Sequence, residues 1–570
     1  MTVKSKVAIL IFGFSFILSC NFTVKALDQF STDYEITYDI NDAGETTVKQ
    51  KVFITNQIED VIATKYSLSI NNMAIYEEKA YEENENINLK KELTQDTITL
   101  TALFEKYTVG KDKTKEFIIE YKTRDLAYRS GKIWSINIPR AQIPDSAKKY
   151  TVTLKIPQTF GNKLFISPQP TSKPESNTYV FLGNDLKNMG ITAAFGEYQI
   201  INFKIKYEIE NPWWINAIYD VALPPDITGV QQISFGGLEP APTKIYLDSD
   251  GNTIARYKLK RKEKLAINLT GTAKISARQI DVSRGGNIDD VSKQILSSYT
   301  KSTKYWESND ELIQKLAKEL YAKDQNVSQN AQKIYNYLVS NFSYDKEIVN
   351  STSKERQGAL LALKNKQNLA CMEFTDSFIA ISRAMDIPSR EINGYAFSSN
   401  EKSQPLSINL NQGDFLHSWA EFYDPSFGWV QIDPTWGNTS GIDYFTKLDT
   451  NHFALVIRGK SSLLPLPAGA YRTTNDKKLL DIGFDQENID SRTFTERLTI
   501  KKRPNFNLFR ILLNQNKYLV VNTGSVAVGN INDKFYLAPH QSKEVYLSKK
   551  IRRLSYKTFD GTNAFVQIQE

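Results

Sequence analysis

One cysteine-bearing stretch limits what this chain can fold into more than any other part of it. Apolar residues follow Cys371 at the spacing of an amphipathic helix, namely Phe374, Phe378, Ile381 and Met385. Asn368 is a good N-cap, and Pro388 ends the helix soon afterwards. The thiol is therefore expected in the first turn of a helix with a buried face. Because a helix N-terminus stabilises anions, Cys371 should ionise more easily than a free thiol, which suits a nucleophile.

A predicted hairpin over residues 416–435 follows this helix. Its first strand alternates, its turn carries Asp, Pro and Gly, and a second strand returns. If Tyr423 pairs with Trp429, His417 and Asp433 both lie an even number of residues from that pair and share a face of the sheet. A histidine beside a thiolate, held by a carboxylate on the next strand, is the arrangement that an activated cysteine needs.

In this order, these stretches resemble the core of the transglutaminase-like superfamily over roughly residues 290–460. The residues that carry the resemblance are Cys371, Arg383-Ala-Met-Asp-Ile-Pro-Ser-Arg390, Gly394-Tyr395, His417-Ser-Trp-Ala-Glu421 and Trp429-Val-Gln-Ile-Asp-Pro-Thr435. The resemblance implies a papain-like α+β fold, in which a helix with the cysteine packs on an antiparallel sheet. It also implies that Cys371 is the nucleophile, His417 the base and Asp433 the orienting acid, with no metal or organic cofactor.

Two positions depart from the pattern of that family. It usually has glycine two residues before the cysteine and glycine before Ile-Pro, and here these positions are Leu369 and Asp386. Aspartate tolerates a left-handed backbone, so Asp386 is a mild change. Leu369 could narrow the approach to the thiol or displace the N–H groups that would hold an oxyanion.

The first 26 residues predict a signal peptide. Lys4 and Lys6 precede an apolar run, and Val24-Lys-Ala26 fits a small-residue cleavage site. The alternative is a lipoprotein-type box that ends at Cys20, which would then be lipidated. Either signal predicts an exported protein, extracellular or in the cell envelope. No later stretch is long and apolar enough to predict a transmembrane helix in the mature chain.

Cysteine usage and charge exclude several classes of protein. The chain has two cysteines, and cleavage after Ala26 leaves only Cys371, which excludes a disulfide scaffold and a cysteine-based zinc site. A lone cysteine is more often a small buried hydrophobe, but the downstream histidine and carboxylate favour a catalytic role. Loss of three lysines with the signal lowers the formal charge from +7 to about +4, which argues against a nucleic-acid-binding protein.

The 570-residue length and the changes in pattern predict several domains. Alternating strands predict a β-sandwich over residues 27–195 and a second β-domain over 196–285. Helices that lead into the cysteine helix open the predicted transglutaminase-like core, residues 290–465. Strands return in a C-terminal β-domain over 470–570. The expected fold class is α+β multidomain, with β-sandwich domains that flank a papain-like transglutaminase-like α+β core.

Three other features have both a functional and an ordinary interpretation. His452 is a rival base, but it has no partner carboxylate at strand spacing, so His417 is preferred. The closely spaced carboxylates at 248–252 suggest calcium, but an Asp-Gly hairpin turn explains them without an ion. Trp213 and Trp214 could bind a sugar or a partner, although such a pair is more often a packed interface.

The predicted function is acyl transfer by an exported thiol enzyme. The Cys371 thiolate would attack an amide bond of a protein or peptide, His417 would shuttle the proton, and a thioester would form. Water as the acceptor gives hydrolysis by a cysteine peptidase or amidase, and an amine gives cross-linking. By resemblance, bacterial members often act as hydrolases, so hydrolysis is favoured.

The rival hypothesis is a catalytically inactive binding or adhesion scaffold of the cell envelope. The large share of β-domains and Leu369 support it, whereas the intact Cys371, His417 and Asp433 oppose it. Basic runs at 501–503 and 549–553 could contact an anionic envelope surface, although a solvated charged face is the more ordinary interpretation.

Overall fold

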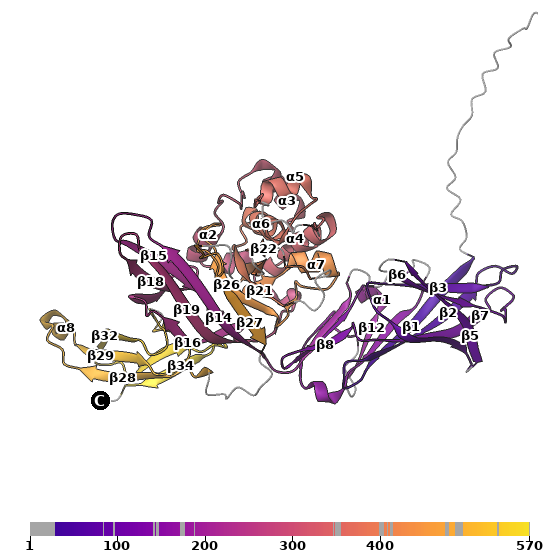
Figure 1. Cartoon of the computed structure of the whole chain (residues 1–570), viewed down its shortest axis with the longest axis horizontal. Coiled ribbons are helices and arrows are strands. Elements are labelled where there is room, and N and C mark those ends of the chain that lie inside the picture. Colours follow the sequence, from indigo (N-terminus) through magenta and orange to yellow (C-terminus); the bar gives the residue numbers. More distant parts are fainter. Residues whose placement is uncertain are drawn as a thin grey trace, which may run out of the picture.

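The computed structural model of the chain describes residues 29–568 apart from several short stretches. The predicted signal peptide and Cys20 lie outside the described residues. Figure 1 shows an elongated arrangement, with the first strands at one end, the last strands at the other and most of the helices gathered between them. None of the described helices is long and apolar enough to cross a membrane. The stretches not described are residues 84, 95–96, 141–142, 144–146, 172–176, 187–188, 346, 348–354, 398–403, 407, 411–413, 474–477, 485–493 and 533–534.

Two sheets in the N-terminal part share one hydrophobic core. Their strands are β1 (Phe30–Ile40), β2 (Thr46–Asn56), β3 (Lys65–Asn71), β4 (Tyr76–Glu82), β5 (Glu85–Thr94), β6 (Thr97–Leu103), β7 (Thr114–Thr123), β8 (Ala127–Ser130), β9 (Ile133–Ile138), β10 (Tyr150–Lys155), β11 (Lys163–Ser167), β12 (Thr178–Leu182) and β13 (Ile191–Phe195), with the short helices η1 (Gln158–Phe160) and α1 (Gly183–Leu186). The strand orders are β12-β10-β1-β2-β7-β4-β5-β6-β3 and β11-β13-β9-β8. Side chains along β2 alternate between buried and partly exposed, as expected where one face of a sheet is covered.

Two further sheets follow and share a second core. Their strands are β14 (Gln199–Glu210), β15 (Ala217–Leu223), β16 (Gln231–Glu239), β17 (Lys244–Leu247), β18 (Thr253–Leu259), β19 (Lys264–Ile275) and β27 (Leu480–Phe484). The orders are β16-β19-β14-β27 and β15-β18-β17. The sequence places β27 in the C-terminal domain, but β27 pairs with β14, from Ile205 opposite Leu480 to Ile201 opposite Phe484. Strand β27 alternates apolar and polar residues in register with β14, and only tertiary pairing reveals that match.

The helical part packs on an antiparallel sheet. Its helices are η2 (Val282–Arg284), η3 (Ile288–Asp290), α2 (Lys293–Tyr299), α3 (Glu311–Leu320), α4 (Val327–Asn341), α5 (Ala359–Asn365), α6 (Cys371–Ala384) and α7 (Pro434–Ser440). Its strands are β20 (Arg278–Gln279), β21 (Ser389–Ala396), β22 (Ile408–Asn409), β23 (Phe415–Asp424), β24 (Gly428–Ile432), β25 (Lys447–Leu448) and β26 (His452–Arg458). The central order is β22-β23-β21-β26, with β24 paired to β23.

Both faces of this central sheet are covered. Ile392 and Phe422 of this sheet share a core with helices α3 to α6. Leu416, Phe453 and Leu455 belong instead to the core of the second pair of sheets. The sheet that carries the candidate histidines is therefore held rigidly between the helices and the preceding β-region.

The last part of the chain forms two small sheets with their own core. Its elements are β28 (Leu498–Arg503), α8 (Leu508–Leu512), β29 (Gln515–Asn522), β30 (Val528–Ile531), β31 (Phe535–Leu537), β32 (Ser542–Ser548), β33 (Arg553–Lys557) and β34 (Asn563–Gln567). The orders are β28-β29-β32 and β31-β30-β33-β34. Helix α8 lies at the far end of this part in Figure 1.

Candidate active site

Cys371 is the first residue of α6, and its side chain is buried. The predicted N-cap Asn368 is wrong, because the cap is Ala370 and Asn368 adopts a left-handed backbone in the preceding turn (φ 56°). The Glu373 carboxylate stabilises this helix start by accepting hydrogen bonds from the N–H groups of Ala370 (2.9 Å) and Gln357 (3.0 Å). The thiol thus lies at the positive end of the helix, where an anion is stabilised.

Helix α6 is buried on almost every side, whereas the sequence predicts one buried face. The buried Asp376 carboxylate of this helix is stabilised by buried hydrogen-bond donors. The Arg356 guanidinium donates through Nε to Asp376 (2.9 Å) and through Nη2 to Glu391 of β21 (3.0 Å). Trp306 Nε1 donates to the same Asp376 carboxylate (2.8 Å). Asp386 ends the helix region with φ 61°, the left-handed conformation that aspartate tolerates.

His417 and Asp433 come together on the predicted hairpin. Strands β23 and β24 pair with Tyr423 opposite Trp429, the register expected from the sequence. His417 Nε2 donates to Asp433 Oδ2 over 2.9 Å. Asp433 is also the N-cap of α7, and its Oδ1 accepts from the N–H of Thr435 (2.9 Å). One carboxylate oxygen is therefore fixed by a helix start and the other is free to orient the imidazole.

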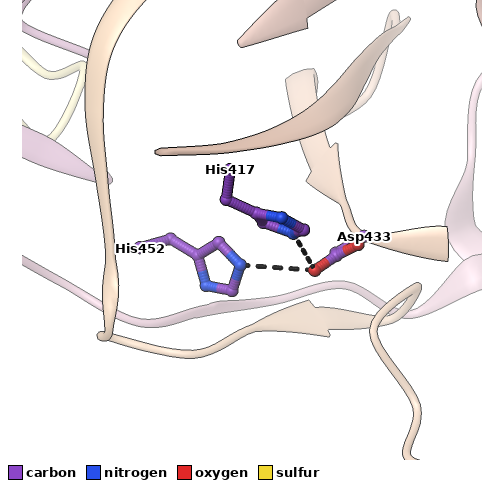
Figure 2. Close-up of side chains that lie close together, drawn as sticks. All are labelled: His417, Asp433 and His452. Atoms are coloured by element: carbon purple, nitrogen blue, oxygen red, sulfur yellow. Dashed lines mark hydrogen bonds and ion pairs between the residues drawn. The ribbon is translucent and has the colours of Figure 1, made fainter. Parts of the chain in front are cut away.

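A second histidine reaches the same carboxylate, as Figure 2 shows. His452 Nε2 lies 3.4 Å from Asp433 Oδ2, and His452 Nδ1 donates to Asp449 over 2.7 Å. His452 has no partner carboxylate at strand spacing, which favoured His417 as the base, but the turn before β26 folds Asp449 back onto His452 at a spacing of three residues. The Asp-x-x-His spacing is the sequence signal that could have revealed this pair. Asp433 therefore lies between two buried imidazoles.

Electrostatics in this cluster favour charged imidazoles. Burial lowers the pKa of His417, but the attraction of Asp433, with a smaller contribution from Cys371, outweighs it and raises that pKa to about 9. His452 follows the same pattern, with Asp449 as its main opposing charge, and its pKa is also raised to about 9. Burial raises the pKa of Asp433, yet the two histidines hold it well below its usual range.

The Nδ1 atom of His417 is the ring nitrogen left for the thiol. Within the described residues, His417 Nδ1 has no hydrogen-bond partner at normal distance. The Cys371 side chain is nevertheless close enough to raise the pKa of the imidazole. Trp436 stacks on the His417 ring with 5.1 Å between centroids, and Trp419 does so at 6.1 Å. The site is thus a buried Cys–His–Asp arrangement with aromatic walls, and it has the chemical parts of a thiol nucleophile with its base and orienting acid.

The histidine pair and its carboxylate also offer metal-ligand chemistry. The ligand atoms of His417, Asp433 and His452 all lie within 4.8 Å of one another. Imidazole nitrogens and a carboxylate are common zinc ligands. A cation there would replace the proton between His417 and Asp433, so metal binding and the Cys–His–Asp arrangement are mutually exclusive.

The other sequence candidates take ordinary structural positions or remain exposed. Trp419 and Glu421 are buried, and Glu421 pairs with Arg390 (2.5 Å). Asp248 accepts from Asn252 N–H (2.8 Å) in the β17–β18 turn, which fits the predicted hairpin. The expected packed interface at the tryptophan pair is wrong, since the two side chains, Trp213 and Trp214, are 63% and 77% exposed.

Comparison with known proteins supports the family of the helical part. Residues 314–434 match the family model described as Transglutaminase-like superfamily, so this segment is a transglutaminase-like core. An uncharacterized protein of Bacillus subtilis (strain 168), YebA, is 29% identical over 161 residues, 27% of this chain and 21% of that protein. An uncharacterized protein of Haemophilus influenzae is 27% identical over 152 residues, 24% of this chain and 39% of that protein. The chain therefore spans well under half the length of these relatives.

Two solved structures show remote similarity. A protein of Cytophaga hutchinsonii, described as a candidate cysteine protease, is 20% identical with a TM-score of 0.31, over 50% of this chain and 98% of that one. The periplasmic domain of TgpA from Pseudomonas aeruginosa, solved with ethylmercury, is 14% identical with a TM-score of 0.23, over 42% and 91% of the two chains. These TM-scores are too low to support an argument about this chain.

Proposed function

We propose that the protein is an exported thiol enzyme that acts on amide bonds of proteins or peptides by acyl transfer. The observation that carries the proposal is the 2.9 Å hydrogen bond from His417 to Asp433, on the sheet that packs against the helix opened by Cys371. A binding scaffold does not require a thiol, an imidazole and a carboxylate in this spatial arrangement. All three residues lie within residues 314–434, the segment that matches the transglutaminase-like family model.

The first half-reaction forms a thioester. The Cys371 thiolate attacks the amide carbonyl carbon, and the carbonyl electrons move onto oxygen. As the first helical residue, Cys371 presents an N–H with no acceptor inside α6, which makes that group the best donor to the oxyanion. The His417 imidazolium then gives its proton to the leaving amine as the C–N bond breaks, while Asp433 keeps the ring oriented.

The second half-reaction depends on the acceptor. Water, deprotonated by neutral His417, would release the acid and regenerate the thiol, whereas an amine would leave a new amide cross-link. We favour hydrolysis, as expected of a bacterial cysteine peptidase or amidase. The mature enzyme would begin at Leu27 and act outside the cell or in the cell envelope, with lipidation at Cys20 as the alternative.

The complete burial of Cys371 and His417 favours a second candidate function. A thiol that no solvent reaches cannot meet a protein substrate unless the surrounding side chains separate. The alternative is that the core is catalytically inactive and the protein serves as a binding or adhesion scaffold of the envelope. The two functions differ in whether Cys371 reacts as a thiolate in the folded protein.

The deciding experiment is the pH dependence of alkylation by iodoacetamide in the chain that starts at Leu27. This chain has a single cysteine, so labelling reports on Cys371 alone. We expect rapid labelling well below the free-thiol pKa of about 8.5, lost in His417→Ala and kept in His540→Ala, a change at an exposed histidine. Labelling that rises only near that pKa, or no labelling of the folded protein, would contradict the enzyme proposal.

The acceptor is tested separately, once the thiolate is established. Incubation of the protein with a casein substrate and a fluorescent primary amine distinguishes the two outcomes. New amino termini and released peptides indicate hydrolysis, whereas fluorescence bound to casein indicates cross-linking. Cys371→Ser is the control in both assays and should abolish both signals.

A further inference from the structure

The C-terminal part carries a short helix, α8, whose side chains all lie outside the core. Helix α8 has no buried residue, yet its backbone is well held. Asn507 caps it by accepting from Arg510 N–H (3.1 Å), and Asn505 Nδ2 donates to the Gln515 carbonyl (2.9 Å). On the other side, Lys549 N–H donates to the Asn514 carbonyl (3.1 Å). These bonds fix residues 505–514, the α8 tip, to strands β29 and β32.

The α8 tip exposes an unusual amount of apolar surface. Single exposed apolar side chains are normal on a protein, but a contiguous group of them marks a contact surface. Here six large apolar residues are exposed within eight consecutive positions, to between 44% and 89% of their area. They are Phe506, Leu508, Phe509, Ile511, Leu512 and Leu513.

Positive charge surrounds these apolar side chains. Residues 501–517 contain five basic residues and no acidic residue. Exposed Lys501, Lys502 and Arg503 end β28, directly before the tip. Exposed Lys549 and Lys550 follow β32, at the turn that is hydrogen-bonded to Asn514. The cations are therefore brought to the tip by two strands, β28 and β32, and not only by the local sequence.

We propose that the α8 tip docks the protein on an anionic lipid surface. Its apolar side chains would enter the boundary between headgroups and acyl chains, and the surrounding lysines and arginines would contact the anionic headgroups. Charge complementarity favours an anionic lipid surface as the partner, because a purely apolar protein interface would leave the surrounding cations without counter-charges. In Figure 1, α8 lies at the extremity of the molecule, where it can meet an extended surface. The inference does not depend on catalysis by Cys371.

Flotation with lipid vesicles tests this proposal on the chain that starts at Leu27. Vesicles of phosphatidylglycerol and phosphatidylethanolamine are compared with vesicles of neutral phosphatidylcholine. We expect binding to the anionic vesicles that weakens as salt rises, and weak binding to the neutral ones. The variant Leu508→Ser/Phe509→Ser/Leu512→Ser should reduce partitioning on the order of tenfold or more, because its apolar insertion is removed.

Two further variants separate the contributions. Lys549→Glu/Lys550→Glu should weaken binding to anionic vesicles without changing binding to neutral ones. Ile58→Ser/Ile62→Ser is the matched control, because it removes exposed apolar side chains beside the acidic Glu59 and Asp60. That control should bind like the unchanged chain. All the substituted side chains are at least 36% exposed, and unchanged circular dichroism would show that the fold is kept.

Three results would overturn the proposal. One is no binding of the unchanged chain to anionic vesicles. Another is equal binding by the triple serine variant. The third is a dimer in light scattering that the triple variant dissociates, without vesicle binding, since a second copy of the chain would then cover the tip.

Discussion

The negative charge of Asp433 decides whether His417 is an imidazolium at neutral pH. Asp433→Asn removes that charge but keeps a side chain of the same size that can still cap α7. In its absence, only the smaller contribution of Cys371 still opposes burial, so the pKa of His417 should fall to about its ordinary value of 6.5 or below. A fall from about 9 corresponds to about 3 kcal/mol of lost preference for the imidazolium.

The same loss weakens the thiolate–imidazolium pair. About 3 kcal/mol is roughly a hundredfold in an equilibrium constant, so alkylation of Cys371 at pH 7 should slow by about two orders of magnitude. The protonation of His417 itself is measured by NMR on chains with labelled histidine. The chain has three histidines, so each resonance can be assigned with single substitutions.

His452 and His540 serve as internal references in this experiment. His452 keeps Asp449 as a partner, so its pKa should fall less than that of His417. Exposed His540 takes no part in this cluster, so its resonance should be the same in both proteins. If His417 in Asp433→Asn still titrates above pH 8, or if alkylation at pH 7 is unchanged, the electrostatic account of the site is refuted.

Three other perturbations have outcomes fixed by the same contacts. The pKa values of His417 and His452, about 9, lie above the value of about 6.5 in the unfolded chain. The stability that the two imidazoliums contribute is therefore complete below about pH 6.5 and is lost as the pH rises through about 9. The melting temperature should fall across this pH window, and it should fall less in His452→Asn. Arg356→Met leaves the buried carboxylate of Asp376 without its ion-pair partner and Glu391 with only the more distant Arg458 (3.6 Å), and urea unfolding should show a loss of about 3–5 kcal/mol. Leu369→Gly removes a fully buried leucine, so the free energy of unfolding in urea should fall by roughly 3 kcal/mol or more. A simultaneous large gain in the alkylation rate of Cys371 would show that Leu369 suppresses catalysis.

Much of the site follows from the local pattern of the sequence. Helical spacing behind Cys371 and strand alternation around the hairpin are properties of neighbouring residues, because the helix and the strand have fixed periods. The pairing of Tyr423 with Trp429 fixes the register, and register alone places His417 near Asp433. These steps need no knowledge of the rest of the chain.

Other parts of the site depend on contacts that the sequence pattern does not show. The N-cap moved from Asn368 to Ala370 because Glu373 satisfies the free N–H and the preceding turn takes a left-handed path. His452 joined the site only because the turn at Asp449 brings β26 beside Asp433. Spacing along one strand could not show a partner that lies across a turn.

The exposure of side chains and the domain to which a strand belongs also depend on the tertiary structure. Trp213 and Trp214 are large apolar side chains that usually pack against other residues, but no segment of the described structure covers them. Strand β27 follows the helical core in sequence, yet it completes the sheet of β14. The sequence by itself determined the thiol helix, the hairpin register and the chemistry that they carry. Only the tertiary structure decided which faces are covered and which charges meet, because burial depends on the segment that packs against a face and not on the face alone.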